Sequence, residues 1–390
     1  MKQVKGYKSQ NNWGGSSMKF YCCLFVSTLL IATSCRKEMT LENSQANDAL
    51  ILRQSQNAKA IIVFVQPGNS IQAAVTNAGA GTIIKIQPGT YKENIVVDKP
   101  GITVSGEGDV VIENPGGKDI GVKVVRGADG FSLSGVTVKG FGERAVEIKG
   151  IDGLLLSHVT AIGNNTEEFG LFVQDCINAT IEHCESTGQK DTGIFVGEST
   201  GVSVFQNKAY ANTIGIETEN AMNITIDKNH VYDNAAGILN LLVPGKSLSQ
   251  SSNITITKNQ VRDNNHINLQ NDPTELEAIL PSGIGILILG ADDMMVEDNH
   301  VTGNQYTGIA VVSTGLLGPT PGIDPVSDHV KIVSNQVKEN GLNPQPSAFP
   351  ASFAADLLWL GPAIGATGTG NCWSNNQYGT SFPSDLPACQ

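Results

Sequence analysis

Apolar and polar residues alternate in short runs along most of this chain, and the same run recurs several times. Each repeat combines an apolar alternation that ends in a residue of buried type, usually Asn, with a turn and a strand that begins Gly-Ile. Alternation with a period of two is typical of β-strands, because successive side chains point to opposite faces. In residues 193–196, for example, we expect Ile194 and Val196 to point inward and Phe195 to point outward.

The intervals between the repeats indicate a solenoid. The residue that ends the alternation occupies one equivalent position in eight repeats, at Val136, Val159, Cys184, Asn207, Asn229, Asn259, Asn299 and Asn335. The intervals are 23, 25, 23, 22, 30, 40 and 36 residues, so a period near 23 is lengthened by insertions. In such a chain each coil buries its apolar face against the next coil. We therefore expect an all-β solenoid whose Asn residues stack along the axis in a structural role.

The segment before the repeats is suited to closing one end of the solenoid. Residues 61–65 have the pattern of a strand, and Ser70 is placed to cap a short helix over residues 71–78. Together with the repeats, these features resemble the right-handed parallel β-helix proteins of the pectin-lyase-like class over residues 60–370. The resemblance implies a single-stranded right-handed parallel β-helix with an N-terminal strand-and-helix cap.

Pattern and resemblance together divide the chain into five segments. We expect a signal peptide at 1–34, which begins at Met1 or at Met18, and a lipidated Cys35 with a polar tether at 35–59. The start of the β-helix with its cap is expected at 60–130, the repeats at 131–370 and a C-terminal tail at 371–390.

The first residues indicate export. Lys19 precedes an apolar run, residues 20–31, that is too short to span a bilayer. The run ends in Ala32-Thr33-Ser34-Cys35, which resembles a bacterial lipobox with Cys35 as the lipidated residue. A secretory signal with a chance cysteine is the alternative. We expect a lipid-anchored protein of the cell envelope, in the outer membrane, on either its periplasmic or its surface side.

Charge narrows the range of partners. Without residues 1–34 the chain has 21 basic and 37 acidic residues, and thus a formal charge of −16. This charge disfavours nucleic acid, whose phosphates need basic partners. It also disfavours polyanionic glycans unless Ca²⁺ bridges the charges, and we expect no other cofactor.

The cysteines and histidines predict structural or surface roles. We expect Cys372 and Cys389 to form a disulfide that fixes the tail, because export permits such bonds. Cys184 occupies an Asn position of the repeat and is expected to be a buried thiol, whereas Cys176 is expected in a turn. The six histidines are expected at the surface, and no Cys or His spacing predicts a metal site.

Four insertions, near 240–252, 264–283, 313–328 and 341–354, flank the Gly-Ile strand of the later repeats. We expect them to wall a groove whose floor is the outward face of that strand. The expected floor is acidic and aromatic in the early coils, at Glu147, Phe172, Gln174, Phe195, Glu217 and Glu219. It is apolar in the later coils, at Leu239, Leu241, Leu287, Leu289, Val312, Leu358 and Leu360. We expect the loops to cover this apolar half; a docking surface for a lipid or a protein partner is the alternative.

Three classes of enzyme share the resembled fold, and this chain carries the residues of none in full. The paired aspartates and Gly-His-Gly of galacturonan hydrolases do not occur on successive Gly-Ile strands, and no Lys or Arg is placed among floor carboxylates as a pectate lyase base would be. The mannuronan epimerase motif Tyr-Gly-x-Asp-Pro-His-Asp corresponds to residues 169–175. That segment keeps the aromatic-Gly start and the final Asp, but it lacks the middle Asp, the Pro and the His.

The most promising polar cluster lies in three adjacent coils. The catalytic candidates are Asp191, Lys190 and Glu217, and the substrate-binding candidates are Phe172, Phe195, Gln174, Glu219 and Asp175. Phe172 and Phe195 are expected to stack about 5 Å apart, which would suit a sugar ring beside the carboxylates. The alternatives are an ordinary aromatic ladder among solvated acids and a surface ion pair between Lys190 and Asp191.

The sequence thus predicts a lipid-anchored protein of the cell envelope that binds polysaccharide, and it leaves catalysis open. It resembles the β-helix repeat lipoproteins of Gram-negative bacteria. Two alternatives are a polysaccharide lyase or uronate epimerase, and a structural or partner-docking lipoprotein without catalysis.

Overall fold

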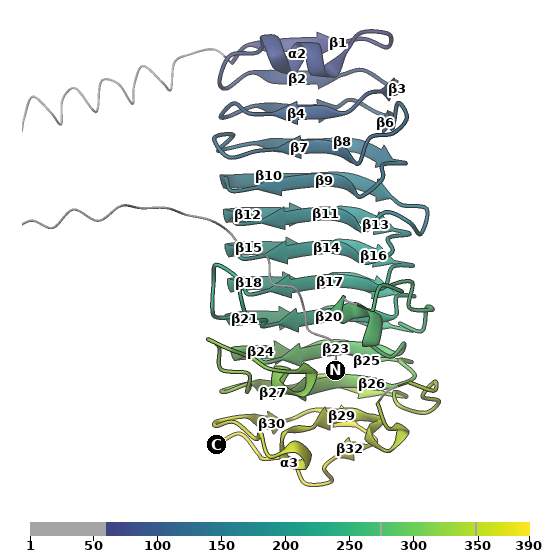
Figure 1. Ribbon diagram of the computed structural model, residues 1–390, viewed down its shortest axis with the longest axis vertical. Coiled ribbons are helices and arrows are strands. Elements are labelled where there is room, and N and C mark those ends of the chain that lie inside the picture. Colours follow the sequence, from purple (N-terminus) through teal and green to yellow (C-terminus); the bar gives the residue numbers. More distant parts are fainter. Residues whose placement is uncertain (1–59, 274, 348) are drawn as a thin grey trace, which may run out of the picture. The chain divides into compact units, whose positions relative to one another are not determined.

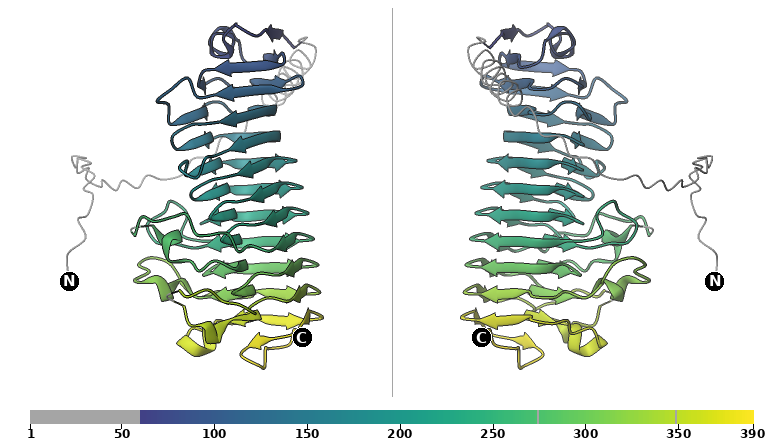
Figure 2. Two further views of the ribbon diagram at one scale, coloured as in Figure 1. Left: turned by 90° about the vertical axis from the view of Figure 1, so that its right-hand side faces the viewer. Right: turned by 90° about the vertical axis from the view of Figure 1, so that its left-hand side faces the viewer.

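The computed structural model describes residues 60–390 except positions 274 and 348. These residues form stacked coils, and most coils give one strand to each of three parallel ladders (Figure 1; Figure 2). The protein is therefore a parallel β-helix, as the sequence predicts. The predicted signal peptide, Cys35 and the tether lie outside the described residues.

Ladder one consists of β1 (Ile62–Val65), β2 (Ile83–Ile86), β5 (Thr103–Gly106), β8 (Ser132–Lys139), β10 (Asp152–Ile162), β12 (Ile177–Glu182), β15 (Thr200–Phe205), β18 (Met222–Asp227), β21 (Ser252–Thr257), β24 (Asp292–Glu297), β27 (Lys331–Val333) and β30 (Cys372–Ser374). Ladder two consists of β3 (Gly89–Lys92), β6 (Val110–Glu113), β13 (Glu185–Thr187), β16 (Lys208–Tyr210), β19 (His230–Tyr232), β22 (Gln260–Arg262), β25 (His300–Thr302), β28 (Gln336–Lys338) and β31 (Gln377–Tyr378). The long strands β8 and β10 pair in both ladders and join them into one sheet.

Ladder three is a separate 11-stranded sheet, and it contains the Gly-Ile strands of the repeats. Its strands are β4 (Ile95–Val97), β7 (Ile120–Val124), β9 (Arg144–Lys149), β11 (Phe169–Gln174), β14 (Thr192–Gly197), β17 (Ile214–Glu219), β20 (Ala236–Leu241), β23 (Ile284–Leu289), β26 (Thr307–Val312), β29 (Ala355–Trp359) and β32 (Ser381–Phe382). The outward face of ladder three is the groove floor that the sequence predicts.

A strand and a helix close the N-terminal end of the described chain. The helix α2 (Ile71–Asn77) begins after Ser70, whose hydroxyl accepts a hydrogen bond from the Ala73 amide at 3.0 Å. The Glu93 carboxylate accepts another from the Ile71 amide at 2.7 Å. Ile71 and Val75 are buried, so the helix covers apolar residues that the first coil would otherwise expose. The predicted cap is confirmed.

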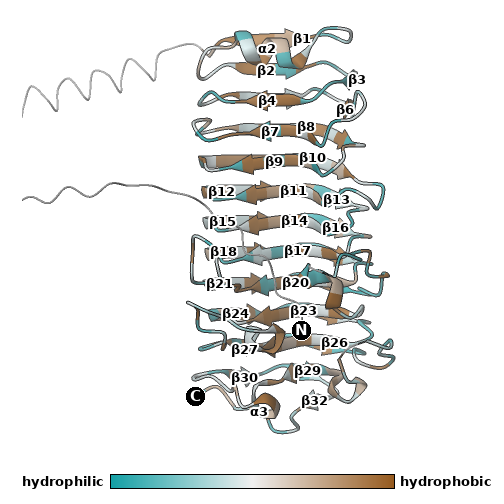
Figure 3. Cartoon of the chain, viewed as in Figure 1, coloured by the Kyte–Doolittle hydropathy of each residue, from teal (hydrophilic) through white to brown (hydrophobic). Residues whose placement is uncertain are grey.

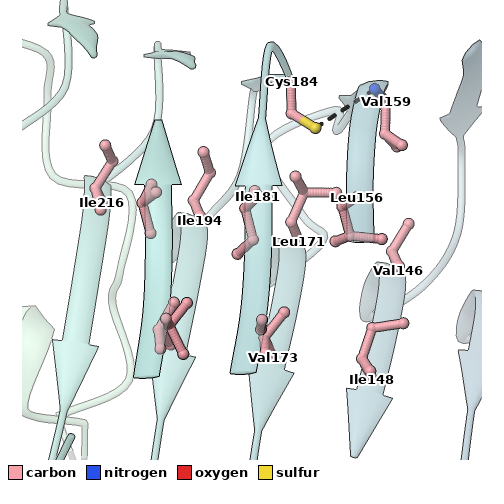
Figure 4. Packing of buried hydrophobic residues seen from close by; sticks show 14 of the residues in the cluster. Val146, Ile148, Leu156, Val159, Leu171, Val173, Ile181, Cys184, Ile194 and Ile216 are labelled. Carbon is pink, nitrogen blue, oxygen red and sulfur yellow. Dashed lines mark hydrogen bonds between the residues drawn. The ribbon is translucent and has the colours of Figure 1, made fainter. Parts of the chain in front are cut away.

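The interior consists of equivalent side chains stacked from coil to coil. Val146, Leu171, Ile194 and Ile216 are register partners on successive strands of ladder three, and all are fully buried (Figure 4). Colouring by hydropathy shows apolar residues recurring along the strands (Figure 3). Cys184 lies in this interior, where its sulfur accepts a hydrogen bond from the Val159 amide at 3.5 Å (Figure 4). Burial raises the pKa of the Cys184 thiol to about 12, and the prediction of a buried thiol is confirmed.

The predicted Asn ladder follows one corner of the coils. Each member accepts hydrogen bonds from the coil before it: the Asn259 side-chain oxygen accepts from the amide of Asn229 at 2.8 Å and from its side-chain nitrogen at 2.9 Å. The ladder starts at Cys184, whose amide donates to Asn207, and it extends one coil further than predicted, to Asn376. Each Asn thereby satisfies buried turn amides, which is a structural role.

A second Asn ladder, absent from the sequence prediction, follows the next corner. It contains Asn212, Asn234, Asn264, Asn304 and Asn340. Asp356 ends it by accepting hydrogen bonds from the amide and the side chain of Asn340. Two of the corners between strands are therefore held by stacked side-chain amides.

The four predicted insertions are the loops 242–251, 263–283, 313–330 and 339–354, and all of them adjoin strands of ladder three. Three contain a short 3-10 helix, namely η1 (Leu276–Ile279), η2 (Thr314–Leu317) and η3 (Ala351–Phe353). Apolar loop residues pack against the outward apolar side chains of β20, β23, β26 and β29; they include Val243, Leu276, Leu280, Leu317, Phe349 and Phe353. The prediction that the loops cover the apolar half of the floor is confirmed.

The chain continues coiling beyond residue 370, where the sequence predicted a tail. After α3 (Gly361–Ile364), β30 pairs with β27 and β32 pairs with β29. The predicted disulfide between Cys372 and Cys389 is present. Neither α2 nor α3, the two α-helices in the described part of the chain, is long and apolar enough to cross a membrane.

Candidate functional site

Two rows of outward side chains follow the groove floor along the β-helix. The first row contains, on successive strands, Lys123, Glu147, Phe172, Phe195, Glu217 and Leu239. The second contains Lys149, Gln174, Gly197, Glu219 and Leu241. Each row contains a lysine, carries a carboxylate on β17 and becomes apolar at β20; the first row starts one strand before its lysine, at Val96 on β4.

The aromatic part of the floor is tightly ordered. The rings of Phe172 and Phe195 stack with centroids 4.7 Å apart and planes 9° apart, as the sequence predicts. Phe169 meets both rings edge-on, and each of the stacked rings is only 6% exposed. At Gly197 an added Cβ would lie 2.5 Å from the Phe195 ring, so this position must be glycine for the ring to lie across it.

A cation covers one edge of the aromatic cluster. The Arg144 guanidinium lies 4.5 Å from the Phe172 ring centroid and pairs with Glu147 at 2.8 Å. Glu147 also faces Lys123 and Lys149, at 3.5 and 3.4 Å. Its charge is therefore matched by three cations, which assigns Glu147 the role of positioning Arg144 and the two lysines.

Two buried carboxyl groups share one hydroxyl beside the aromatic rings. Thr192 Oγ1 lies 2.6 Å from Glu217 Oε2 and 3.0 Å from Asp191 Oδ1. The hydroxyl has one hydrogen, so it can donate to only one of these oxygens at a time. A proton held on the other carboxyl lets that group donate back to Thr192. The geometry therefore suits a pair in which one carboxyl is protonated.

The surroundings of the pair favour that proton. Asp191 is 5% exposed and Glu217 is 2% exposed. Burial raises the pKa of Glu217 well above its ordinary value, and the negative charges of Glu277, Asp191 and Glu219 raise it further. Burial likewise raises the pKa of Asp191, with Glu277 as its main charged neighbour. A neutral carboxylic acid is thus available here at pH values where exposed carboxyls are ionised.

Two loops complete the site. From the 263–283 loop, Gln270 Nε2 approaches Asp191 Oδ2 at 3.5 Å, and Glu277 lies close enough to act on both carboxyls. From the 242–251 loop, Lys246 Nζ pairs with Glu219 at 2.5 Å. Burial alone would lower the pKa of Lys246, but Glu219 and then Glu198 raise it above its ordinary value, so this lysine is a cation rather than a free base.

These residues surround a cavity of about 250 Å³, which we call the acidic cavity. Its floor is the aromatic pair with Glu217 and Glu219, and its walls are the two loops. Its carboxyl groups are Glu168, Asp191, Glu217, Glu219, Glu275 and Glu277. Arg144 and Lys246 are the cations that line it. Acidic groups beside stacked rings suit an uncharged, hydroxyl-rich ligand such as a sugar.

The structure brings most of the predicted site residues together. Phe172, Phe195, Gln174, Glu219, Asp191 and Glu217 all line the acidic cavity. Asp175 does not: it is exposed, pairs with Arg126 and lines a neighbouring hollow over β7 and β9. Lys190 is also absent from the lining.

Both structural alternatives for these residues, a surface ion pair and an aromatic ladder among solvated acids, are wrong for the same reason. A surface ion pair between Lys190 and Asp191 requires an exposed aspartate, whereas Asp191 is buried beneath Gln270. An aromatic ladder among solvated acids requires exposed carboxylates, whereas Glu217 is buried too. The 263–283 loop covers both, and a single coil gives no sign of this.

The sequence prediction missed several members of the site, namely Arg144, Phe169, Lys246, Gln270, Glu275 and Glu277. Arg144 and Phe169 are register partners at the first position of β9 and β11, two residues before the inward Val146 and Leu171, so strict alternation would have placed them inward. The other four lie in loops, where no periodicity gives their direction. Within residues 60–390, as far as they are described, no three His, Cys, Asp or Glu side chains are arranged to hold a metal ion.

Comparison with known proteins supports the fold. The sequence matches the family described as "Right handed beta helix region" over residues 120–265 and 243–380. No curated protein sequence is similar enough to match the chain. The A-module of the Azotobacter vinelandii mannuronan C-5 epimerase AlgE4 is similar in structure, with a TM-score of 0.55 and 20% identity over 78% of this chain and 82% of that chain. DFA-IIIase from Arthrobacter chlorophenolicus A6, in complex with GF2, has a TM-score of 0.51 and 14% identity over 89% of this chain and 86% of that chain.

Proposed function

Because this chain belongs to the family of right-handed β-helix proteins, we propose that it processes a polysaccharide in the acidic cavity, with Asp191 and Glu217 as its catalytic pair. The observation that carries the proposal is the shared Thr192 hydroxyl between two buried carboxyl groups. The structural neighbours named above, a mannuronan epimerase and DFA-IIIase in complex with GF2, agree with a carbohydrate ligand.

The pair fits hydrolysis of a glycosidic bond. Glu217, the more buried group, donates its proton to the glycosidic oxygen as that oxygen leaves the anomeric carbon. Asp191, as a carboxylate, forms a bond to that carbon, because two carboxyls that reach one hydroxyl are too close together to hold a water between them. A water then gives its proton to Glu217 and its oxygen replaces Asp191 on the carbon, so both carboxyls return to their starting states and one water is consumed for each bond broken. Phe172 and Phe195 provide the apolar surface for a sugar ring.

The charge of the cavity favours a neutral polysaccharide. Both of its lining cations are already engaged, Lys246 by Glu219 and Arg144 by Glu147. A uronate carboxylate entering here would face six acidic side chains with no free cation among the residues lining the cavity. The alternative of a lyase or uronate epimerase, whose substrate carries that carboxylate, is less well supported for this reason.

We also propose that the protein is anchored in the cell envelope through a lipid on Cys35, which the residues 32–35 support. Cys35→Ser in the full chain should move the protein from the membrane fraction to the soluble fraction, with loss of radiolabelled fatty acid. Equal lipid labelling of the variant would rule out this anchor.

The activity is tested with the full-length protein and a panel of neutral and acidic polysaccharides. We expect new reducing ends from a neutral polysaccharide, and at least a hundredfold slower release with Glu217→Gln or Asp191→Asn. Glu185→Gln is the matched control, because Glu185 is a carboxyl on ladder two that bonds Tyr210 instead. Unsaturated ends or altered uronates would support the lyase or epimerase alternative, and full activity of both cavity variants would refute the assigned pair.

A further inference from the structure

We infer that the acidic cavity takes the end of a polysaccharide chain and not its middle, an inference that rests on the proposed function. The feature that leads to it is a groove that stops abruptly. Contacts among the described residues show at which end of the groove the floor is covered and at which end it is open.

The groove ends immediately after β17. The next residues in the two floor rows, Leu239 and Leu241, are fully buried. They belong to an apolar cluster that includes Leu280 and packs against Leu276, both from the 263–283 loop, and against Val243 from the 242–251 loop. A bound chain therefore meets packed leucine side chains at this end.

The two loops also close the sides. The 263–283 loop is held to the coil of β17 by a hydrogen bond from the Leu269 amide to Thr213 Oγ1 at 3.0 Å. On the opposite ends of the strands, the 242–251 loop reaches back to Glu198, which accepts a hydrogen bond from the Ser247 amide at 2.6 Å. Each loop thus extends over the coils that carry the carboxyl pair.

The remaining direction, toward β9 and β7, is open. The Lys149 and Lys123 side chains on these strands are 44% and 42% exposed. Gln174 lines both the acidic cavity and the neighbouring hollow above these strands, so the two spaces adjoin. A chain that enters the cavity can continue only over this hollow.

The size of the cavity agrees with a terminal unit. Pockets for drug-sized ligands measure roughly 300–1,000 Å³, and the acidic cavity, at about 250 Å³, is smaller. It has room for a terminal sugar and its linkage, while the following units lie over β9 and β7. The hydrolytic products would then be short, because each cleavage removes only the part inside the cavity.

The test compares a linear oligosaccharide with a cyclic one of the same sugar and linkage, using the cleavable sugar found with the panel. Binding is measured on Glu217→Gln, so that the ligand survives, and cleavage on the unaltered protein. We expect the linear ligand to bind at least tenfold more tightly, and short products from the first minutes of polymer cleavage. Comparable binding of the cyclic ligand, or early products of every length, would overturn the chain-end inference and leave the proposed function intact.

A second variant tests the open side. Arg126 borders the hollow over β7 and β9 and lies outside the acidic cavity. Arg126→Ala should weaken binding of long linear oligosaccharides about fivefold and leave the shortest ligand unaffected. Equal loss for short and long ligands would contradict the direction that we assign to the chain. Absence of binding by every linear ligand would overturn the inference and the proposed function together.

Discussion

At the scale of single residues, the decisive feature is the buried carboxyl group of Glu217. Glu217 would be an ordinary floor residue if β17 were open to solvent, as Lys123 is on β7. Loop residues exclude water from Glu217. Four acidic side chains lie around it, namely Asp191, Glu219, Glu275 and Glu277. Such a group holds its proton at pH values where an exposed glutamate has lost it.

This proton makes the stability of the protein depend on pH. Because burial raises the pKa of Glu217 above its ordinary 4.5, the folded state keeps a proton that the unfolded state loses. The stabilising contribution is therefore complete below pH 4.5 and decreases as the pH rises toward the folded-state pKa, by about 1.4 kcal/mol per pH unit. Glu217→Gln should flatten this dependence in unfolding curves measured at a series of pH values. Glu185→Gln is the control, and an unchanged slope in Glu217→Gln would contradict the prediction.

The stacked phenylalanines provide a second prediction at this scale. Phe172→Leu with Phe195→Leu keeps apolar side chains but removes the rings, so glycan affinity should fall about tenfold. The matched control replaces another stacked pair, Tyr210 and Tyr232, whose centroids are 5.0 Å apart on ladder two. Affinity electrophoresis separates the two outcomes. Equal retention of both double variants would show that the phenylalanine rings do not contact the glycan.

At the scale of the elements, the corners of the coils stabilise the fold together with the strands. Asn259 is almost fully buried, and its side chain makes four hydrogen bonds, two given and two received, with Asn229, Ile226 and Asn299. Its amide group cannot be replaced by water at that position. The corner therefore depends on the residue type, whereas a strand position accepts several apolar residues.

Asn259→Ala should lower the free energy of unfolding by about 3 kcal/mol, because buried partners on two neighbouring coils lose their hydrogen bonds. Asn343→Ala is the matched control: Asn343 is exposed, its backbone is not left-handed, and the change should alter stability by less than about 0.5 kcal/mol. Urea unfolding measures both. A loss in Asn259→Ala no larger than that of the control would show that the ladder does not stabilise the fold.

The elements also show how far sequence reasoning reaches. Local alternation and the repeat period together predict the strands, the cap, the first Asn ladder and the covered leucines. The second ladder follows the first at a constant offset of five residues, as in Asn229 and Asn234 or Asn259 and Asn264, so the signal was present and was missed. The cavity walls could not be predicted in this way. Gln270 meets Asp191 across 79 residues, and only the fold of the loop determines that contact.

At the scale of the whole described chain, stability is a sum of contacts between neighbouring coils. The disulfide between Cys372 and Cys389 closes a segment of 17 residues at the C-terminal end. Cys372→Ser with Cys389→Ser should therefore destabilise the last coils by about 3 kcal/mol. The acidic cavity lies several coils away and should keep its ligand affinity.

Limited proteolysis and ligand binding, measured on the same preparation, check this prediction. We expect faster cleavage within residues 355–390 and an unchanged dissociation constant. A parallel loss of ligand binding would show that the coils unfold as one cooperative unit and not from the end inward.

The uniform pairing of the early coils has one further consequence. None of the four insertions lies before β20, so β7 and its neighbours repeat the same backbone bonds without interruption. One more turn of chain inserted there would restore every bond above and below it. The spacing between the N-terminal cap and the acidic cavity can thus grow in increments of roughly 4.8 Å. Evolution can therefore lengthen this part of the β-helix without changing the residues of the acidic cavity.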